Sequence, residues 1–178
     1  MFNIFIDGKE GTTGLKIFER MAKRTDVAVR ALPEDLRKDP AARKACINEA
    51  DVVFLCLPDA AAKESVSLIE NDKVRIIDAS TAHRTAPEWV YGFPELSKAH
   101  EDKIRSSNRV AVPGCHASGF ISLVYPLIAG GFVEKDYPFV CHSVTGYSGG
   151  GKKMIAEYEA ENRAEEYESP RQYALTQN

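Results

Sequence analysis

Short apolar runs alternate with amphipathic stretches along the first half of the chain, at the spacing of repeating strand and helix units. Residues 52–57 are apolar on both alternations, which is typical of a parallel strand covered on both faces. The pattern predicts an α/β fold with a doubly wound parallel sheet that binds ligands at the carboxyl ends of its strands. The predicted strands are Phe2–Ile6, Val27–Leu32, Val52–Leu57, Val74–Ile77 and Arg109–Val112, and helices are predicted through Leu15, Phe18 and Ala22, from Pro40 to about Asn48 and from Ala60 to Ile69.

The organisation changes after this alternating region. Ala79 to Ser107 has no clear periodicity and is predicted to be a long loop, of a kind that is usually functional or flexible. A helix should begin at Cys115, and Pro126 should kink or end it. A strand is expected over Phe139–Thr145 and a weakly amphipathic, Glu-rich helix beyond Lys153. We therefore predict a dinucleotide-binding domain over residues 1–114 and the start of a second, α+β domain over residues 115–178.

Composition narrows the class of protein. The 178 residues are 44% hydrophobic and 28% charged, which is ordinary for a globular chain, and the net charge of −3 offers no basic footprint for nucleic acid or a membrane surface. No apolar run approaches the ~20 residues of a membrane helix. Four cysteines at irregular spacings argue against a disulfide scaffold or a metal site. We expect a cytoplasmic protein with a small-molecule ligand.

The first motif is a glycine-rich turn between the first predicted strand and the first predicted helix. Gly8, Gly11 and Gly14 follow a G-x-x-G-x-x-G spacing, with Thr12 and Thr13 between the last two. Glycines allow a sharp turn and a close approach to a pyrophosphate, which then lies on the helix N-terminus. We predict that these five residues bind a dinucleotide, although a tight turn in a non-binding protein could use the same glycines.

The residues after the second strand leave the type of cofactor open. Glu34 and Asp35 lie where an acid would bind the ribose of NAD, whereas Arg37 and Lys38 could pair with the 2′-phosphate of NADP.

A polar cluster follows the fourth predicted strand, where it would face the ligand crevice. Ser80 could bond the cofactor, and the Arg84 guanidinium could bind a phosphate or carboxylate. The alternative is a helix-capping cluster with an exposed arginine.

Cys115 is the candidate nucleophile. Pro113 and Gly114 force a turn there, and the positive end of the following helix favours the thiolate. His116 is not expected to be its base, because adjacent side chains on a helix do not face each other. The remaining cysteines should be buried and structural, as free cysteines generally are: Cys46, Cys56 and Cys141.

A second glycine-rich segment runs from Gly146 to Lys152. A bend of this kind that enters a helix can cradle an anion, and Ser148 and Gly149 are therefore candidate cofactor contacts. A flexible loop is the alternative.

Five motifs occur in an order that resembles one enzyme family, the N-acetyl-γ-glutamyl-phosphate reductases of the arginine pathway, in their shorter subclass. The motifs are Gly8-x-x-Gly11-x-x-Gly14, Asp78-x-Ser80-x-x-His83-Arg84, Tyr91-Gly92-Phe93-Pro94-Glu95-Leu96, Pro113-Gly114-Cys115-His116-Ala117-Ser118 and Gly146-Tyr147-Ser148-Gly149-Gly150-Gly151-Lys152.

The resemblance implies a Rossmann domain that binds NADP(H), and a catalytic and dimerisation domain that forms a homo-oligomer. It implies that the Cys115 thiolate attacks N-acetylglutamyl 5-phosphate, that phosphate leaves, and that hydride from NADPH reduces the thioester to the 5-semialdehyde. Arg84 becomes a candidate for the anionic groups of the substrate, and no metal is implied.

The family's general acid/base histidine has no counterpart among the four histidines of this chain. The resemblance therefore places that base beyond Asn178 and implies that the chain stops inside the second domain. Two alternatives stay open. One is an enzyme of the aspartate-semialdehyde dehydrogenase type, although there the cysteine usually follows Asn, whereas here it follows Gly114. The other is a fragment that binds the cofactor without catalysing a reaction.

Overall fold

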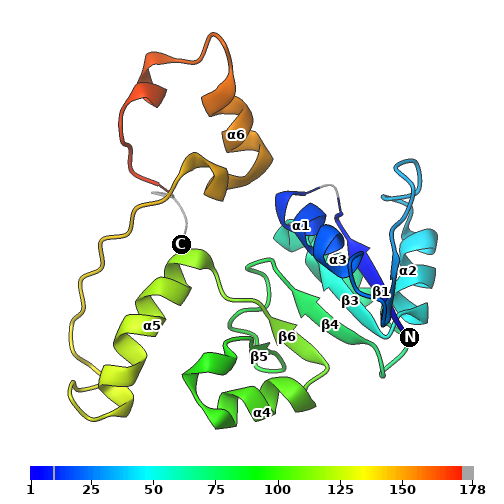
Figure 1. Cartoon of the computed structure of the whole chain (residues 1–178), viewed down its shortest axis with the longest axis horizontal. Helices are drawn as coiled ribbons and strands as arrows, with labels where there is room; N and C mark the ends of the chain where they lie inside the picture. The colour runs from blue at the N-terminus through cyan, green and yellow to red at the C-terminus, as the bar shows by residue number, and fades with distance from the viewer. Residues whose placement is uncertain (10, 174–178) are drawn as a thin grey trace. The chain divides into compact units, whose positions relative to one another are not determined.

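A computed structural model describes residues 1–9 and 11–173 (Figure 1). Residue 10 of the first glycine motif and residues 174–178 of the expected second domain lie outside the described residues. The chain divides into two compact units, Met1–His142 and Ser143–Asn178, and each is described by itself below.

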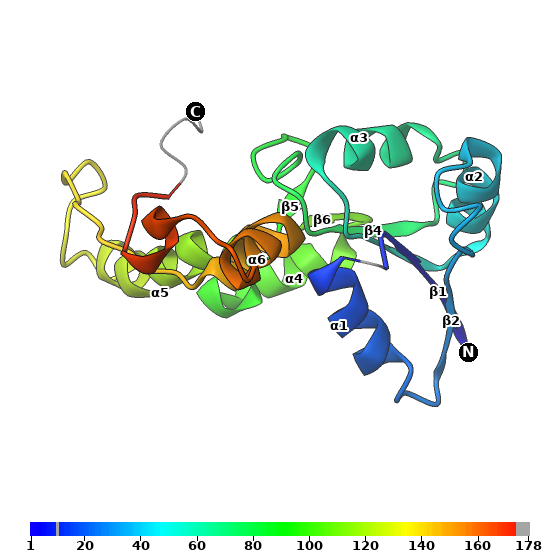
Figure 2. The same cartoon turned by 90° about the horizontal axis from the view of Figure 1, so that it is seen from above.

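The first unit is built on a parallel sheet of six strands within the described residues, in the order β2-β1-β3-β4-β6-β5. The five strands predicted from the apolar runs all form, and the doubly wound fold is confirmed. Figure 2 shows α2 and α3 on one face of the sheet and α1 on the other. The strands are β1 (Phe2–Asp7), β2 (Val27–Arg30), β3 (Val52–Leu55), β4 (Arg75–Asp78), β5 (Val90–Tyr91) and β6 (Arg109–Ala111). The helices are α1 (Thr12–Met21), α2 (Pro40–Glu49), α3 (Asp59–Ser67), the short 3-10 helix η1 (Pro94–Leu96), α4 (Lys98–Ser106) and α5 (Cys115–Ala129).

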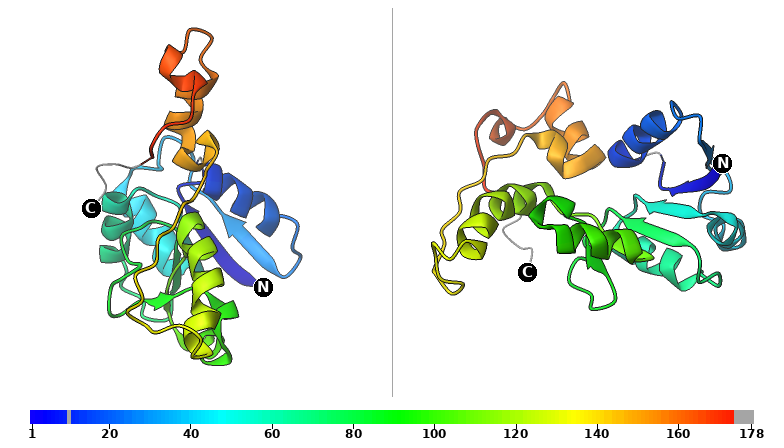
Figure 3. Two further views of the ribbon diagram at one scale, coloured as in Figure 1. Left: turned by 90° about the vertical axis from the view of Figure 1, so that its left-hand side faces the viewer. Right: turned by 60° about the horizontal axis from the view of Figure 1, so that its bottom comes forward.

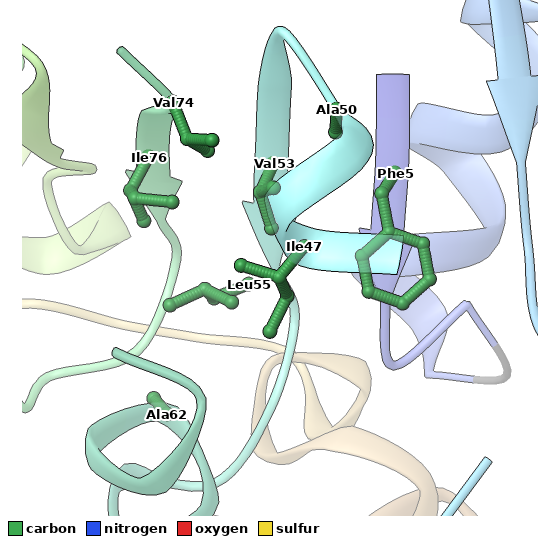
Figure 4. Packing of buried hydrophobic residues seen from close by; sticks show 8 residues of the cluster. All are labelled: Phe5, Ile47, Ala50, Val53, Leu55, Ala62, Val74 and Ile76. Atoms are coloured by element: carbon green, nitrogen blue, oxygen red, sulfur yellow. The ribbon is translucent and has the colours of Figure 1, made fainter. Parts of the chain in front are cut away.

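The hydrophobic core lies between the sheet and the pair α2 and α3. Alternate residues of β3, Val53 and Leu55, are fully buried, and they pack with Ile47 of α2 (Figure 4). Each fully buried side chain of this size contributes roughly 1.5–3 kcal/mol by leaving water. Together they fix the central strands, and so the position of the strand ends. The cluster comprises Phe5, Ile47, Ala50, Val53, Leu55, Ala62, Val74 and Ile76.

The segment without periodicity is more ordered than the sequence indicates. It contains β5, η1 and α4, and Ser97 caps α4 by accepting a hydrogen bond from the backbone N–H of His100. The helix is stabilised along its exposed face by ion pairs from Glu101 to Lys98 and Arg105. Helices of this kind carry little apolar periodicity, and Ser97 followed by charges at helical spacing is the signal that could have revealed it.

Two further expectations concern the residues after Cys115. The α5 helix continues through Pro126 to Ala129, so Pro126 ends it only within the following turn. The strand expected over Phe139–Thr145 is wrong, since these residues form no regular structure. Val140 and Val144 are 90% and 99% exposed, because an apolar alternation makes a strand only where a neighbouring strand pairs with it.

The second unit confirms the expected glycine-rich bend that leads into a helix. The 3-10 helix η2 (Tyr147–Gly150) is followed by α6 (Gly151–Glu159) and by η3 (Glu165–Glu168) (Figure 3). Gly151 joins the first two with a φ of +77°, a conformation that side-chain-bearing residues rarely adopt. Among the helices of the described residues, none has the length and apolar character to cross a membrane.

Candidate functional site

Four strands of the first unit end side by side, and this edge carries the candidate site. Asp7, Leu55, Asp78 and Ala111 are consecutive partners in the register of β1, β3, β4 and β6. Strands lie about 4.8 Å apart, so the row from Asp7 to Ala111 spans roughly 14 Å. The chain reverses its winding between β1 and β3, and ligands of open α/β sheets bind at such a switch point.

The glycine turn lies between β1 and α1, as predicted, and the strand order places it at this switch point. Gly8 has a φ of +87°, and a Cβ there would overlap the carbonyl oxygen of Cys56 at the end of β3. A Cβ on Gly14 would overlap the carbonyl oxygen of Gly8. Packing alone therefore requires these two glycines. Thr12 and Thr13 are exposed at the first turn of α1, where backbone N–H groups point out of the helix.

Gly11 differs from the other two glycines. Leaving aside its chain neighbours and the backbone of its own helix, a Cβ at Gly11 would come no closer than 3.4 Å to an atom of the described residues, and its backbone is extended, with φ −74° and ψ 159°. The fold does not require glycine here, whereas a pyrophosphate at the helix N-terminus does. This open cradle fits a dinucleotide.

Gly11→Ala is expected to weaken binding of NADPH by at least about tenfold and to change the free energy of unfolding by roughly 1 kcal/mol or less. Calorimetric titration with NADPH and urea unfolding measure the two effects. Gly14→Ala is the matched control, which should lose stability as well as binding. Full affinity in Gly11→Ala would contradict the assignment of this turn to the cofactor.

A buried ion pair fixes the residue that precedes the glycine turn. Asp7 and Arg43 are 4% and 5% exposed, and Nε and Nη2 of Arg43 each lie 3.2 Å from Oδ2 of Asp7. The Ser65 hydroxyl donates to the same oxygen at 2.7 Å. One carboxylate thus joins α2 and α3 to the strand end that precedes Gly8. Burial raises the pKa of the neighbouring Cys56 thiol to about 12, and the negative charge of Asp7 contributes to this increase.

The turn after β4 is organised by a second buried carboxylate. Asp78 is fully buried and accepts hydrogen bonds from the backbone N–H and the hydroxyl of Ser80, at 2.9 and 2.7 Å. Nδ1 of His83 lies 2.6 Å from Oδ2 of Asp78. The His83 ring stacks on Trp89 with centroids 4.2 Å apart. His83 therefore has a structural role at the edge of the core, and the Ser80 hydroxyl belongs to this internal network.

Arg84 links this turn to the turn before Cys115. Its Nε donates to the Val112 carbonyl at 3.0 Å, and its Nη2 donates to the Ala79 carbonyl at 3.3 Å. Its Nη1 lies 2.7 Å from the place that a Cβ of Gly114 would occupy. The guanidinium is therefore next to the residue that precedes Cys115.

Cys115 is the first residue of α5, and its side chain is exposed. Gly114 is the N-cap, and its carbonyl accepts hydrogen bonds from the N–H and the hydroxyl of Ser118. The expected strand–turn–helix setting is confirmed. The thiol faces solvent beside the first-turn N–H groups, a position in which an oxyanion could also be stabilised.

The other expected residues divide into three groups. Cys46 and Cys56 are half-buried. The expectation that Cys141 is buried is wrong: it is exposed, and it lies in residues 139–145, which form no regular structure. Ser148 and Gly149 are exposed in η2 of the second unit. The four charged residues after β2 are all exposed, with a loose ion pair of 3.7 Å between the first and third: Glu34, Asp35, Arg37 and Lys38.

Sequence reasoning missed Arg43, Trp89 and the pairing of Gly114 with Arg84. Arg43 lies in a helix of otherwise ordinary composition, and nothing local marks its partner 36 residues away. Nothing local marks Gly114 either, because glycine is a common residue at a helix start and Gly11 occupies the same position of α1 without a close neighbour. No group of three or more metal-binding side chains occurs in the described part of the chain.

The fold and this edge define the class: a doubly wound nucleotide-binding domain with an exposed cysteine at a second helix start. Comparison with known proteins agrees. Residues 14–104 match the semialdehyde dehydrogenase NAD binding domain, and residues 115–177 match the semialdehyde dehydrogenase dimerisation domain. The chain belongs to the semialdehyde dehydrogenase family, whose cofactor is a nicotinamide dinucleotide.

Within that family, the chain is similar to N-acetyl-gamma-glutamyl-phosphate reductases. It is 50% identical to that of Burkholderia cenocepacia over 161 residues, covering 90% of this chain and 51% of the relative. It is 52% identical to that of Chelativorans sp. over 156 residues, covering 88% and 50%. The chain thus spans about half the length of the curated relatives it matches.

Solved structures show the same fold. Aspartate semialdehyde dehydrogenase from Francisella tularensis superposes with a TM-score of 0.61 at 18% identity, over 89% of this chain and 48% of that one.

Proposed function

We propose that this chain is the cofactor-binding and nucleophile-bearing part of an N-acetyl-γ-glutamyl-phosphate reductase. The reaction is the reversible, NADPH-dependent reduction of N-acetyl-L-glutamyl 5-phosphate to the 5-semialdehyde and phosphate. The observation that carries the proposal is the placement of Cys115 and the glycine turn on one edge of the sheet, at α5 and α1. The identity of about 50% to reductases of this name supports the choice of substrate.

Each residue has a defined chemical task. The thiolate of Cys115 attacks the acyl carbon, the bond from that carbon to the phosphate oxygen breaks, and phosphate leaves with that bond's electron pair. The N–H groups at the start of α5 stabilise the oxyanion, at roughly 3–4 kcal/mol for one donor in comparable sites. Arg84, beside Gly114, attracts the anionic groups of the substrate.

The glycine turn would hold the cofactor, with Gly8, Gly11 and Gly14 allowing the approach of the pyrophosphate and Thr12 and Thr13 available to bind it. A bound nicotinamide cofactor supplies the hydride that reduces the acyl thioester on Cys115. Collapse of the resulting thiohemiacetal releases the aldehyde and restores the thiolate. We propose further contacts to the cofactor from Ser80, Ser148 and Gly149. Arg37 and Lys38 are exposed after β2 and are available for a 2′-phosphate, which favours NADP(H).

The match to a dimerisation domain favours a homo-oligomer of the whole protein, and the family favours a cytoplasmic biosynthetic role. The general acid/base is expected from the part of the relatives that this chain does not span.

The test, made on the whole protein that contains this chain, is the reverse reaction, in which N-acetylglutamate 5-semialdehyde, phosphate and NADP⁺ give reduced cofactor, followed by absorbance. The expected rate depends on phosphate and on this semialdehyde, and NAD⁺ is a poorer cofactor. An equal rate with aspartate semialdehyde would favour the aspartate-semialdehyde dehydrogenase alternative, with which the solved structures share the fold. Calorimetric binding of NADPH without turnover would favour the cofactor-binding fragment.

A further inference from the structure

We propose that Arg84 is a positioning residue for Cys115, and that residue 114 is glycine because the Arg84 guanidinium takes the space of a side chain. This role is additional to attraction of substrate anions. It rests on the proposed function only in taking Cys115 as the nucleophile.

The first observation is how the guanidinium is held. Two of its nitrogens donate to backbone carbonyls on neighbouring strand ends, Val112 after β6 and Ala79 after β4. These strand ends are themselves joined, because the Val112 N–H donates to the Asp78 carbonyl at 2.7 Å. Arg84 therefore closes a bridge over the end of the sheet, immediately before the helix that Cys115 begins.

The second observation is the conformation of Gly114. Its φ of −76° and ψ of 152° are extended backbone that any residue adopts, so the turn does not itself require glycine. A Cβ there would lie 2.7 Å from Nη1 and 3.3 Å from Cζ of Arg84. Real Cβ atoms do not approach neighbours so closely, and an alanine would push the guanidinium away from the turn. Gly114 and Arg84 are therefore a matched pair.

The third observation is that the backbone of Arg84 has its own anchor. Asp78 is fully buried and binds both Ser80 and His83. His83 is in turn stacked on Trp89. The loop that carries Arg84 is thus fixed to the core at several points, and the positive charge reaches the Cys115 turn from a rigid base. The reactivity of a cysteine depends on the donors and cations that are held around its sulfur.

The test measures the rate at which neutral iodoacetamide alkylates Cys115, by mass spectrometry of peptides from the native chain. Cys141 in the same molecule is the internal reference, because it is also exposed but begins no helix and lies in residues 139–145, which form no regular structure. We expect Arg84→Ala to slow Cys115 alkylation about tenfold relative to Cys141. Because the Cys115 side chain is already exposed in the native chain, a gain in its accessibility would not hide the slower alkylation. Iodoacetamide carries no charge, so a role limited to binding substrate anions would not change the ratio.

Arg75→Ala is the matched control. Arg75 also binds backbone carbonyls, those of Ile104, Arg105 and Ser107, but at the opposite end of β4. It should lower the free energy of unfolding and leave the alkylation ratio unchanged. Arg84→Lys, which keeps the charge but loses the two-carbonyl bridge, should restore the ratio in part.

Gly114→Ala tests the pair independently of how well Arg84→Ala folds. It should slow Cys115 alkylation severalfold in the native background and have little further effect in Arg84→Ala, where the clash is absent. Gly11→Ala, at the N-cap of α1 with the same extended backbone, controls for the general cost of alanine at a helix cap. A native alkylation ratio in Gly114→Ala, or in a folded Arg84→Ala protein, overturns the proposal. Because no substrate is used, failure of the proposed reaction would leave these results unaffected.

Discussion

Cys115→Ser in the whole protein that contains this chain is expected to lower the rate of phosphate-dependent semialdehyde oxidation at least about a thousandfold, while binding of NADPH is retained. A serine hydroxyl is far less acidic and less nucleophilic than a thiol, so the substituted residue cannot form the acyl intermediate at a useful rate. The assay is the reduction of NADP⁺ with N-acetylglutamate 5-semialdehyde, paired with calorimetric titration of NADPH.

Cys141→Ser is the matched control, since Cys141 is the other exposed cysteine and should be dispensable. Mass spectrometry of the native chain mixed with an acyl phosphate should show an acyl group on Cys115 and none on Cys141. Retained activity in Cys115→Ser, or acylation elsewhere, would remove Cys115 from the mechanism. Cys56 should stay unmodified at neutral pH, because burial and the nearby Asp7 raise the pKa of its thiol to about 12.

Arg43→Met is expected to lower the free energy of unfolding by about 3–5 kcal/mol. The substitution leaves the Asp7 carboxylate, 4% exposed, without its cationic partner, and the Ser65 hydroxyl cannot offset the loss of that charge. Since Asp7 directly precedes Gly8, we also expect weaker binding of NADPH in the fraction that stays folded. Urea unfolding of the native and substituted chains measures the loss of stability.

Lys44→Met is a matched control on the next residue of the same helix. Lys44 pairs with Glu70 at 2.6 Å, but the two side chains are 44% and 69% exposed, so this ion pair is worth about 1 kcal/mol or less. Equal losses from the two substitutions would show that burial of the Asp7–Arg43 pair carries no special weight. Adding Asp7→Asn to Arg43→Met should recover part of the loss, because it removes the unpaired charge.

The fold was largely predictable, because its signals are local. Parallel strands buried on both faces read as short apolar runs, and the helices between them begin at recognisable turns, as at Pro40 and Cys115. The predictions failed where a structure depends on a neighbour or on charges. The α4 helix is stabilised by a cap and ion pairs instead of an apolar face, and the apolar residues of 139–145 find no strand to pair with.

The candidate site was predictable in part. The glycine turn and Cys115 were visible because each has a sequence pattern tied to a strand end and a helix start. Ser80 and Arg84 follow β4 at the carboxyl edge of the sheet, as expected, but the pattern could not show that Ser80 binds Asp78 or that Arg84 binds two carbonyls. Such contacts depend on rotamers and on strands far apart in the sequence.

The sequence by itself determined the alternation of strands and helices, the nucleotide-type turn and the cysteine at a helix start, because each follows from residues within one turn or one strand. Only the tertiary structure decided which glycines the fold needs and which it leaves open to a ligand. It also decided that Asp7 is paired with Arg43, and that Gly114 makes room for Arg84. The glycine contacts join residues up to 48 positions apart in the sequence, and the ion pair joins residues 36 positions apart. Only the packed sheet brings such residues together.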